Sequence, residues 1–171
     1  MLEAAFQECF GASHNTLLRG GAPEPLYEPP RDGRPGLIHY RADYAASALH
    51  EVAHWCIAGT GRRELEDYGY WYEPDGRDAR QQAAFEQVEV RPQAVEWHFA
   101  LAAGLEFRVS FDNLSQAAPG GDRFANAVLS QARRFCEEPL PPRAELFRRA
   151  LADRLGGNAE PTPGCFQGTG A

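Results

Sequence analysis

The sequence predicts a helix-rich α+β fold in a single domain. Apolar residues recur at helical spacing in several segments, whereas strand-like patterns are confined to two short stretches. The chain has 171 residues, 43% of them hydrophobic, and a single domain holds about 100 to 200 residues. We therefore expect one domain over residues 1–155 and a flexible C-terminal tail, rich in Gly, Pro and Thr, over 156–171.

The N-terminal half begins with an amphipathic segment, residues 2–10, that predicts a short helix. Residues 20–36 contain five prolines and four glycines, which predicts a loop. Residues 37–40 form a candidate strand. Good helix formers follow over residues 44–58, where Asp43 is the expected N-cap.

The C-terminal half is dominated by helical patterns. Pro92 has no N–H group, so it either kinks the helix that contains it or begins a new one. Four helices are expected, over residues 78–90, 92–104, 122–137 and 143–155, together with one strand over residues 107–111.

The charge composition excludes several classes of function. All 17 basic residues are arginines, so no lysine is present to form a Schiff base or to bind phosphate in a P-loop. A net charge of −7 argues against binding to the nucleic-acid backbone. No apolar run approaches the roughly 20 residues that cross a membrane, and the four cysteines are widely spaced. We expect a cytoplasmic protein without nucleic-acid or membrane partners.

The most specific motif is HExxH, at residues 50–54, within a predicted helix. Side chains four residues apart share one face of a helix, so His50 and His54 can bind one metal ion. Glu51 then lies beside the metal, where it can transfer or hold a proton. Composition alone predicts on the order of 0.01 such motifs in this chain. The motif therefore indicates a metal site but does not specify its reaction.

Two histidines need a third protein ligand. Glu86, Glu89 and Gln93 share one face of the following predicted helix, with apolar neighbours that favour burial. Glu89 is the expected ligand, because Gln93 one turn later could orient it. Glu86 is the second candidate and Glu96 the third. All three glutamates could instead be exposed surface carboxylates.

Other residues are weaker candidates. Arg62 follows the metal helix and either lies in solvent or binds a carboxylate near the site. Tyr70 and Trp71, in an aromatic-rich segment, either pack on the core or line a substrate pocket. His98, beside aromatic residues, is expected to be a core histidine, and Cys56 a buried apolar residue.

Several long strings resemble the elongation factor P hydroxylases. They are residues 50–59 (HEVAHWCIAG), 62–64 (RRE), 67–72 (DYGYWY), 74–78 (PDGRD) and, within 85–94, FE, VEV and PQA. The resemblance is dense from Leu17 to Phe111 and thinner to Leu155. Such strings are much more specific than HExxH alone.

The resemblance implies a bacterial enzyme that hydroxylates a lysine of elongation factor P after that lysine has received a β-lysyl group. It also implies a non-haem metal centre of two histidines and one carboxylate on a zincin-like scaffold. His50 and His54 match the metal histidines, and Glu89 is expected to match the carboxylate, although Glu86 lies in the same string. The partner would be β-lysylated elongation factor P.

The sequence does not identify the metal ion. Two imidazoles and one carboxylate leave positions on iron(II) at which molecular oxygen and a substrate C–H bond can meet, as a hydroxylase requires. The same ligands on zinc would serve a metallopeptidase or another hydrolase, with Glu51 as general base. A purely structural metal site is disfavoured, because such sites have four protein ligands.

Overall fold

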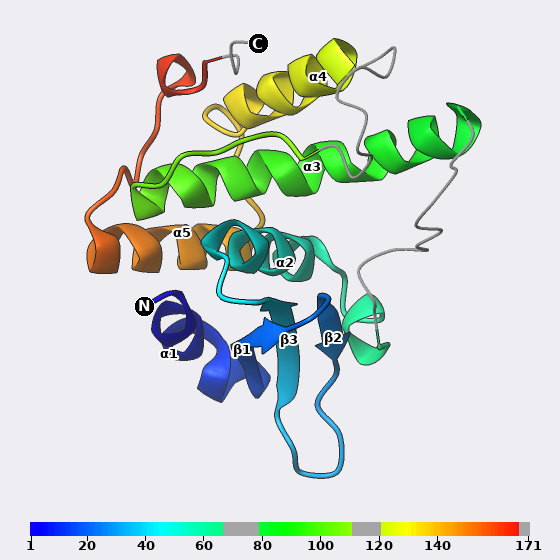
Figure 1. Cartoon of the computed structure of the whole chain (residues 1–171). Helices are drawn as coiled ribbons and strands as arrows, with labels where there is room; N and C mark the ends of the chain where they lie inside the picture. The colour runs from blue at the N-terminus through cyan, green and yellow to red at the C-terminus, as the bar shows by residue number, and fades with distance from the viewer. Residues whose placement is uncertain (67–78, 111–120, 168–171) are drawn as a thin grey trace.

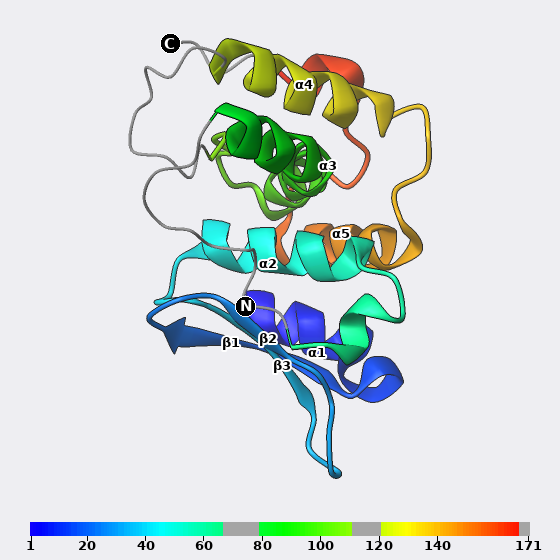
Figure 2. The ribbon, with the colours of Figure 1, turned by 90° about the vertical axis from the view of Figure 1, so that its right-hand side faces the viewer.

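The computed structural model describes residues 1–66, 79–110 and 121–167, without the side chains of residues 79–84. Within these ranges the chain forms stacked layers (Figures 1 and 2). The sheet and α1 (Leu2–His14) lie at one end; then come α2 (Ala45–Ile57) and α5 (Pro142–Leu155), next α3 (Ala79–Ala103), and finally α4 (Gly121–Arg134). The predicted helix-rich α+β class is confirmed.

The sheet has three strands in the order β1-β3-β2. These are β1 (Thr16–Ala22), β2 (Leu26–Glu28) and β3 (Gly36–Arg41), with β1 parallel and β2 antiparallel to β3. The strand predicted at 37–40 is confirmed. The loop predicted over residues 20–36 is wrong in part, because it contains the end of β1 and all of β2. The prolines flank β2, an edge strand, and leave its pairing with β3 intact.

Helix α2 agrees closely with the helix predicted over residues 44–58. Its N-cap is Tyr44 rather than the expected Asp43, and no side chain caps that end. At the other end, the Arg143 guanidinium donates to the carbonyl oxygens of Trp55, Cys56 and Ala58. These carbonyls have no partner within the helix, so Arg143 fixes the end of the helix that carries HExxH.

Helix α3 is one uninterrupted helix of 25 residues, with Pro92 inside it. Pro92 lacks an N–H group, so the carbonyl of Val88 loses its helical partner, yet the helix continues. The two helices expected on either side of Pro92 are therefore one element. As a result, residues on both sides of the proline belong to the same helical surface.

The C-terminal half also differs from prediction after α3. The strand expected over residues 107–111 does not form over the described part of that range. Instead, Phe107 stacks on Trp97 with ring centroids 4.6 Å apart, and the backbone of Ser110 hydrogen-bonds to the Gln93 side chain. Alternation without a partner strand is not enough to form a sheet. The other two predicted helices are confirmed as α4 and α5.

Residues 156–167 pack on the domain, in contrast to the flexible tail expected there. Phe166 is fully buried, 4.7 Å from the His98 ring, and its carbonyl accepts a hydrogen bond from Arg133. Gly157 lies so close to α3 that a Cβ atom would collide with the carbonyl oxygens of Leu101 and Ala102. One buried aromatic residue therefore anchors a segment whose composition is typical of a mobile tail.

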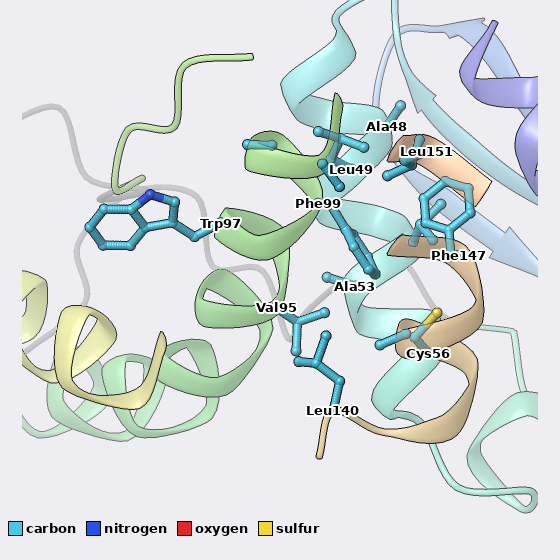
Figure 3. Packing of buried hydrophobic residues seen from close by; sticks show 14 of the residues in the cluster. Ala48, Leu49, Ala53, Cys56, Val95, Trp97, Phe99, Leu140, Phe147 and Leu151 are labelled. Carbon is cyan, nitrogen blue, oxygen red and sulfur yellow. The ribbon is translucent and has the colours of Figure 1, made fainter. Parts of the chain in front are cut away.

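A continuous hydrophobic core joins the layers (Figure 3). Leu49 and Ala53 of α2, Phe99 of α3 and Phe147 of α5 belong to this buried cluster. None of the helices described is long and apolar enough to cross a membrane. The core thus fixes α2 against α3, the two helices that carry the candidate site.

Candidate metal centre

The HExxH motif presents two imidazoles on the side of α2 that faces α3. His50 and His54 are one helical turn apart, and their Nε2 atoms lie 3.1 Å from each other. The side chain of each histidine is 23% exposed. The two rings therefore converge at a site that is partly open to solvent.

Glu89 of α3 completes this group. Its side chain is 1% exposed, with Oε1 3.1 Å from His54 Nε2 and Oε2 3.7 Å from His50 Nε2. One potential ligand atom from each of His50, His54 and Glu89 lies within 4.8 Å of the other two, an arrangement that could hold a metal ion. Two imidazoles and a carboxylate suit iron or zinc.

Two further polar residues of α3 contact this group. Glu96, 7% exposed, places Oε2 2.8 Å from Nδ1 of His50. The amide nitrogen of Gln93, 1% exposed, donates to Oε2 of Glu89 over 3.1 Å. Residues 89, 93 and 96 follow helical spacing on one face of α3. The buried polar side of α3 therefore meets the histidines of α2.

Negative charge dominates the electrostatics of the site. Burial disfavours the imidazolium form of His50, but the hydrogen bond and charge of Glu96, with smaller contributions from Glu51 and Glu89, raise the pKa of His50 to about 10. For Glu51, burial is the largest effect and raises the pKa of its carboxyl group; His50 and His54 act in the opposite direction. A site with three carboxylates near two imidazoles favours a bound cation.

The structure separates the three glutamates that the sequence left as alternatives. Glu89 lies in the group with the two histidines, whereas Glu86 is half-buried and outside it. Glu96, the third candidate ligand, contacts the far nitrogen of His50 instead. The expected contact between Gln93 and Glu89 is confirmed. The role of Glu96 was missed, although its spacing of seven residues from Glu89 places both on one helical face.

Of the three candidate substrate residues, Arg62 alone lies within the described residues. Arg62 is exposed in the 3-10 helix η1 (Arg62–Glu64), after the end of α2. Tyr70 and Trp71 lie outside the described residues. The contribution of these residues to a pocket therefore stays a prediction.

The residues expected to be structural behave as predicted. Cys56 is 2% exposed, and His98 is 1% exposed with Nε2 2.9 Å from the carbonyl oxygen of Ala132. Burial lowers the pKa of His98 to about 4, so this histidine is neutral in the folded protein. His39 of β3 pairs with Glu28 of β2.

Comparisons with known proteins identify the family of this chain. The family described as elongation factor P hydroxylase matches residues 5–161 of the chain. The elongation factor P lysine hydroxylase of Haemophilus influenzae (strain ATCC 51907 / DSM 11121 / KW20 / Rd) is 48% identical over 149 residues, which are 86% of this chain and 84% of that protein. The matched region contains α2 and α3 together with His50, His54 and Glu89. The chain therefore belongs to the elongation factor P hydroxylase family.

Proposed function

We propose that this protein hydroxylates the β-lysylated lysine side chain of elongation factor P in the cytoplasm. The reaction would take place at a non-haem iron(II) centre held by His50, His54 and Glu89, with molecular oxygen as co-substrate. The observation that carries the proposal is the convergence of these three side chains within 4.8 Å in a chain of this family. The relative from Haemophilus influenzae is itself named a lysine hydroxylase of elongation factor P.

The contacts within the group support a resident metal ion. Two Nε2 atoms only 3.1 Å apart share at most one proton between them, whereas a cation accepts the lone pairs of both. The buried carboxylate of Glu89 contributes the negative charge that offsets such a cation. Bound iron(II) would supply the oxygen activation that insertion into a C–H bond requires.

Glu51 is the candidate catalytic residue of the chain. It follows His50 directly and is half-buried, at the side of the pair of histidines. Hydroxylation by molecular oxygen places one oxygen atom in the C–H bond and reduces the other to water, which consumes two electrons and two protons. The carboxyl group of Glu51 would hold and deliver a proton beside the substrate. Arg62, Tyr70 and Trp71 would contact the substrate.

The first experiment is mass spectrometry of elongation factor P from cells with and without this gene. We expect the modified lysine to gain about 16 Da, the mass of one oxygen atom, only when the gene is present. An unchanged mass distribution in the deletion strain would refute the hydroxylase function.

A second experiment separates the hydroxylase from a zinc metallopeptidase or other hydrolase with the same three ligands. The purified protein is loaded with iron(II) or with zinc and incubated with β-lysylated elongation factor P, with ascorbate as reductant, in air and under nitrogen. We expect an oxygen-dependent mass gain with iron alone. Oxygen-independent cleavage of the substrate by the zinc form would favour the hydrolase.

A further inference from the structure

We propose that Gln93 and Glu96 are positioning residues of the metal centre. Each hydrogen-bonds to a ligand side chain at an atom other than the proposed binding atom, and thereby presents Oε1 of Glu89 and Nε2 of His50 to the metal. This inference rests on the proposed metal centre and extends it, because it specifies which atom of each side chain binds and which residue selects it.

Glu96 selects the binding nitrogen of His50. An imidazole that binds a metal keeps one proton, on the nitrogen that does not contact the ion. Glu96 Oε2 lies 2.8 Å from Nδ1 of His50, so the carboxylate keeps the proton on Nδ1. Nε2 is then the free donor, and it is also the nitrogen that faces His54 and Glu89.

Gln93 selects the binding oxygen of Glu89. The Gln93 amide oxygen accepts from the N–H of Ser110 over 3.0 Å, and its amide nitrogen donates to the carbonyl of the same residue over 2.9 Å. These two bonds fix the orientation of the amide, with its nitrogen toward Glu89. That nitrogen donates to Oε2, whereas Oε1 lies 3.1 Å from Nε2 of His54. Gln93 therefore engages Oε2, and Oε1, the oxygen nearer to a histidine nitrogen, is the proposed metal ligand.

Burial makes both contacts consequential. Glu96 and Gln93 are only 7% and 1% exposed, and a buried carboxylate or amide destabilises the fold unless it is hydrogen-bonded. Each of them finds a partner in a proposed ligand, one on α2 and one on α3. Binding through a single oxygen of Glu89 leaves more positions on the metal for oxygen and substrate than binding through both oxygens.

The test measures cobalt(II) binding to the purified full-length protein, by competition with a chromophoric chelator and from the visible absorption of the bound ion. Glu96→Leu and Gln93→Leu are expected to weaken binding by about 10- to 100-fold. Glu96→Gln keeps an acceptor oxygen, so its affinity is expected to lie between those of the wild type and Glu96→Leu. Gln93→Leu is also expected to change the cobalt spectrum, because Oε2 then lacks the hydrogen bond from Gln93.

Matched controls isolate these contacts. Gln87→Leu changes an exposed glutamine of the same helix, and Glu138→Gln an exposed glutamate after α4. Both are expected to bind cobalt like the wild type. If a leucine variant does not fold, Gln93→Met and Glu96→Gln replace the pair, with expected losses of several-fold. The inference is overturned if the folded variants match the wild type within about twofold in affinity and have its spectrum.

The outcomes distinguish this inference from the function on which it rests. A wild-type protein that binds no cobalt would refute the proposed metal centre itself. Variants that bind like the wild type would refute only the assignment of Gln93 and Glu96. Hydroxylation of elongation factor P is tested independently, by the mass comparison between the two strains.

Discussion

The two sides of α2 differ sharply in chemistry. On one side, His50 and His54 meet a buried carboxylate of α3. On the other side, Trp55 packs with aromatic rings of α1, 5.3 Å from Phe6 and 4.9 Å from Phe10. Phe147 of α5 extends this cluster at 5.9 Å from Phe6. The same helix is therefore held by apolar burial on one face and carries ionisable groups on the other.

The two sides of α2 therefore contribute differently, one to the stability of the fold and the other to the metal site. Apolar burial on the aromatic side stabilises the fold in proportion to the area removed from water. Buried carboxylates on the polar side contribute little or destabilise unless a cation offsets them. We therefore expect substitutions on the two sides to have opposite signatures: loss of stability from the aromatic side, and loss of metal from the polar side.

The largest expected effect is that of Glu89→Ala on metal binding. Removal of the proposed carboxylate ligand should abolish binding, a loss of at least about 100-fold measured by cobalt titration. Glu86→Ala is the matched control on the same helix and should keep wild-type affinity. The opposite pattern would mean that Glu86 is the ligand and that the polar side has been assigned incorrectly.

Phe147→Ala tests the aromatic side. Phe147 is fully buried and contacts Phe6, Phe10 and Phe99, so truncation should lower the free energy of unfolding by about 3–5 kcal/mol. Urea denaturation measures this loss. The folded fraction should bind cobalt with nearly wild-type affinity. A loss below about 1 kcal/mol would show that the aromatic cluster contributes little to the stability of the fold.

A third prediction concerns a buried histidine outside the metal site. The folded pKa of His98 is about 4, against 6.5 for an ordinary histidine, so the unfolded chain binds a proton first as the pH falls. The stability due to neutral His98 is complete above pH 6.5 and is lost between pH 6.5 and 4, by about 3 kcal/mol. Urea denaturation across this pH range should show that the free energy of unfolding depends less steeply on pH in His98→Gln than in the wild type. Equal slopes for both proteins would contradict the buried, neutral state of His98.

The smallest expected effect is stabilisation by metal. A ligand at 100 times its dissociation constant stabilises a folded protein by about 2.7 kcal/mol. Cobalt should raise the unfolding temperature of the wild type and of Glu86→Ala by the amount that corresponds to this free energy. His54→Ala should show no shift, since it lacks one of the two imidazoles. A full shift in His54→Ala would place the metal elsewhere.

The local part of the site could be predicted from the sequence. HExxH fixes the relative positions of His50 and His54, because helical geometry is set by residues close in the chain. Glu89 was also predicted, from helical spacing and apolar neighbours. The contact between Glu96 and His50 could not be predicted, since it depends on how α3 packs against α2 over 46 residues of sequence.

Prediction of the fold is limited in the same way, by contacts between residues distant in the sequence. Helices with strong periodicity were predicted to within a few residues, because their hydrogen bonds are local. Strands β1 and β2 were missed, because both pair with β3 further along the chain and prolines flank β2. The predicted strand near Phe107 did not form, because the partner of Ser110 is a glutamine side chain. Phe166 gave too weak a signal to predict its packing on α3.

The most direct test of the central claim combines the site with the reaction. A strain that lacks the gene is complemented with the wild type, Glu86→Ala, His54→Ala or Glu89→Ala, and its elongation factor P is analysed by mass spectrometry. We predict that the gain of about 16 Da on the modified lysine returns with the wild type and Glu86→Ala alone. Full hydroxylation with His54→Ala or Glu89→Ala, at matched protein levels, would contradict the account.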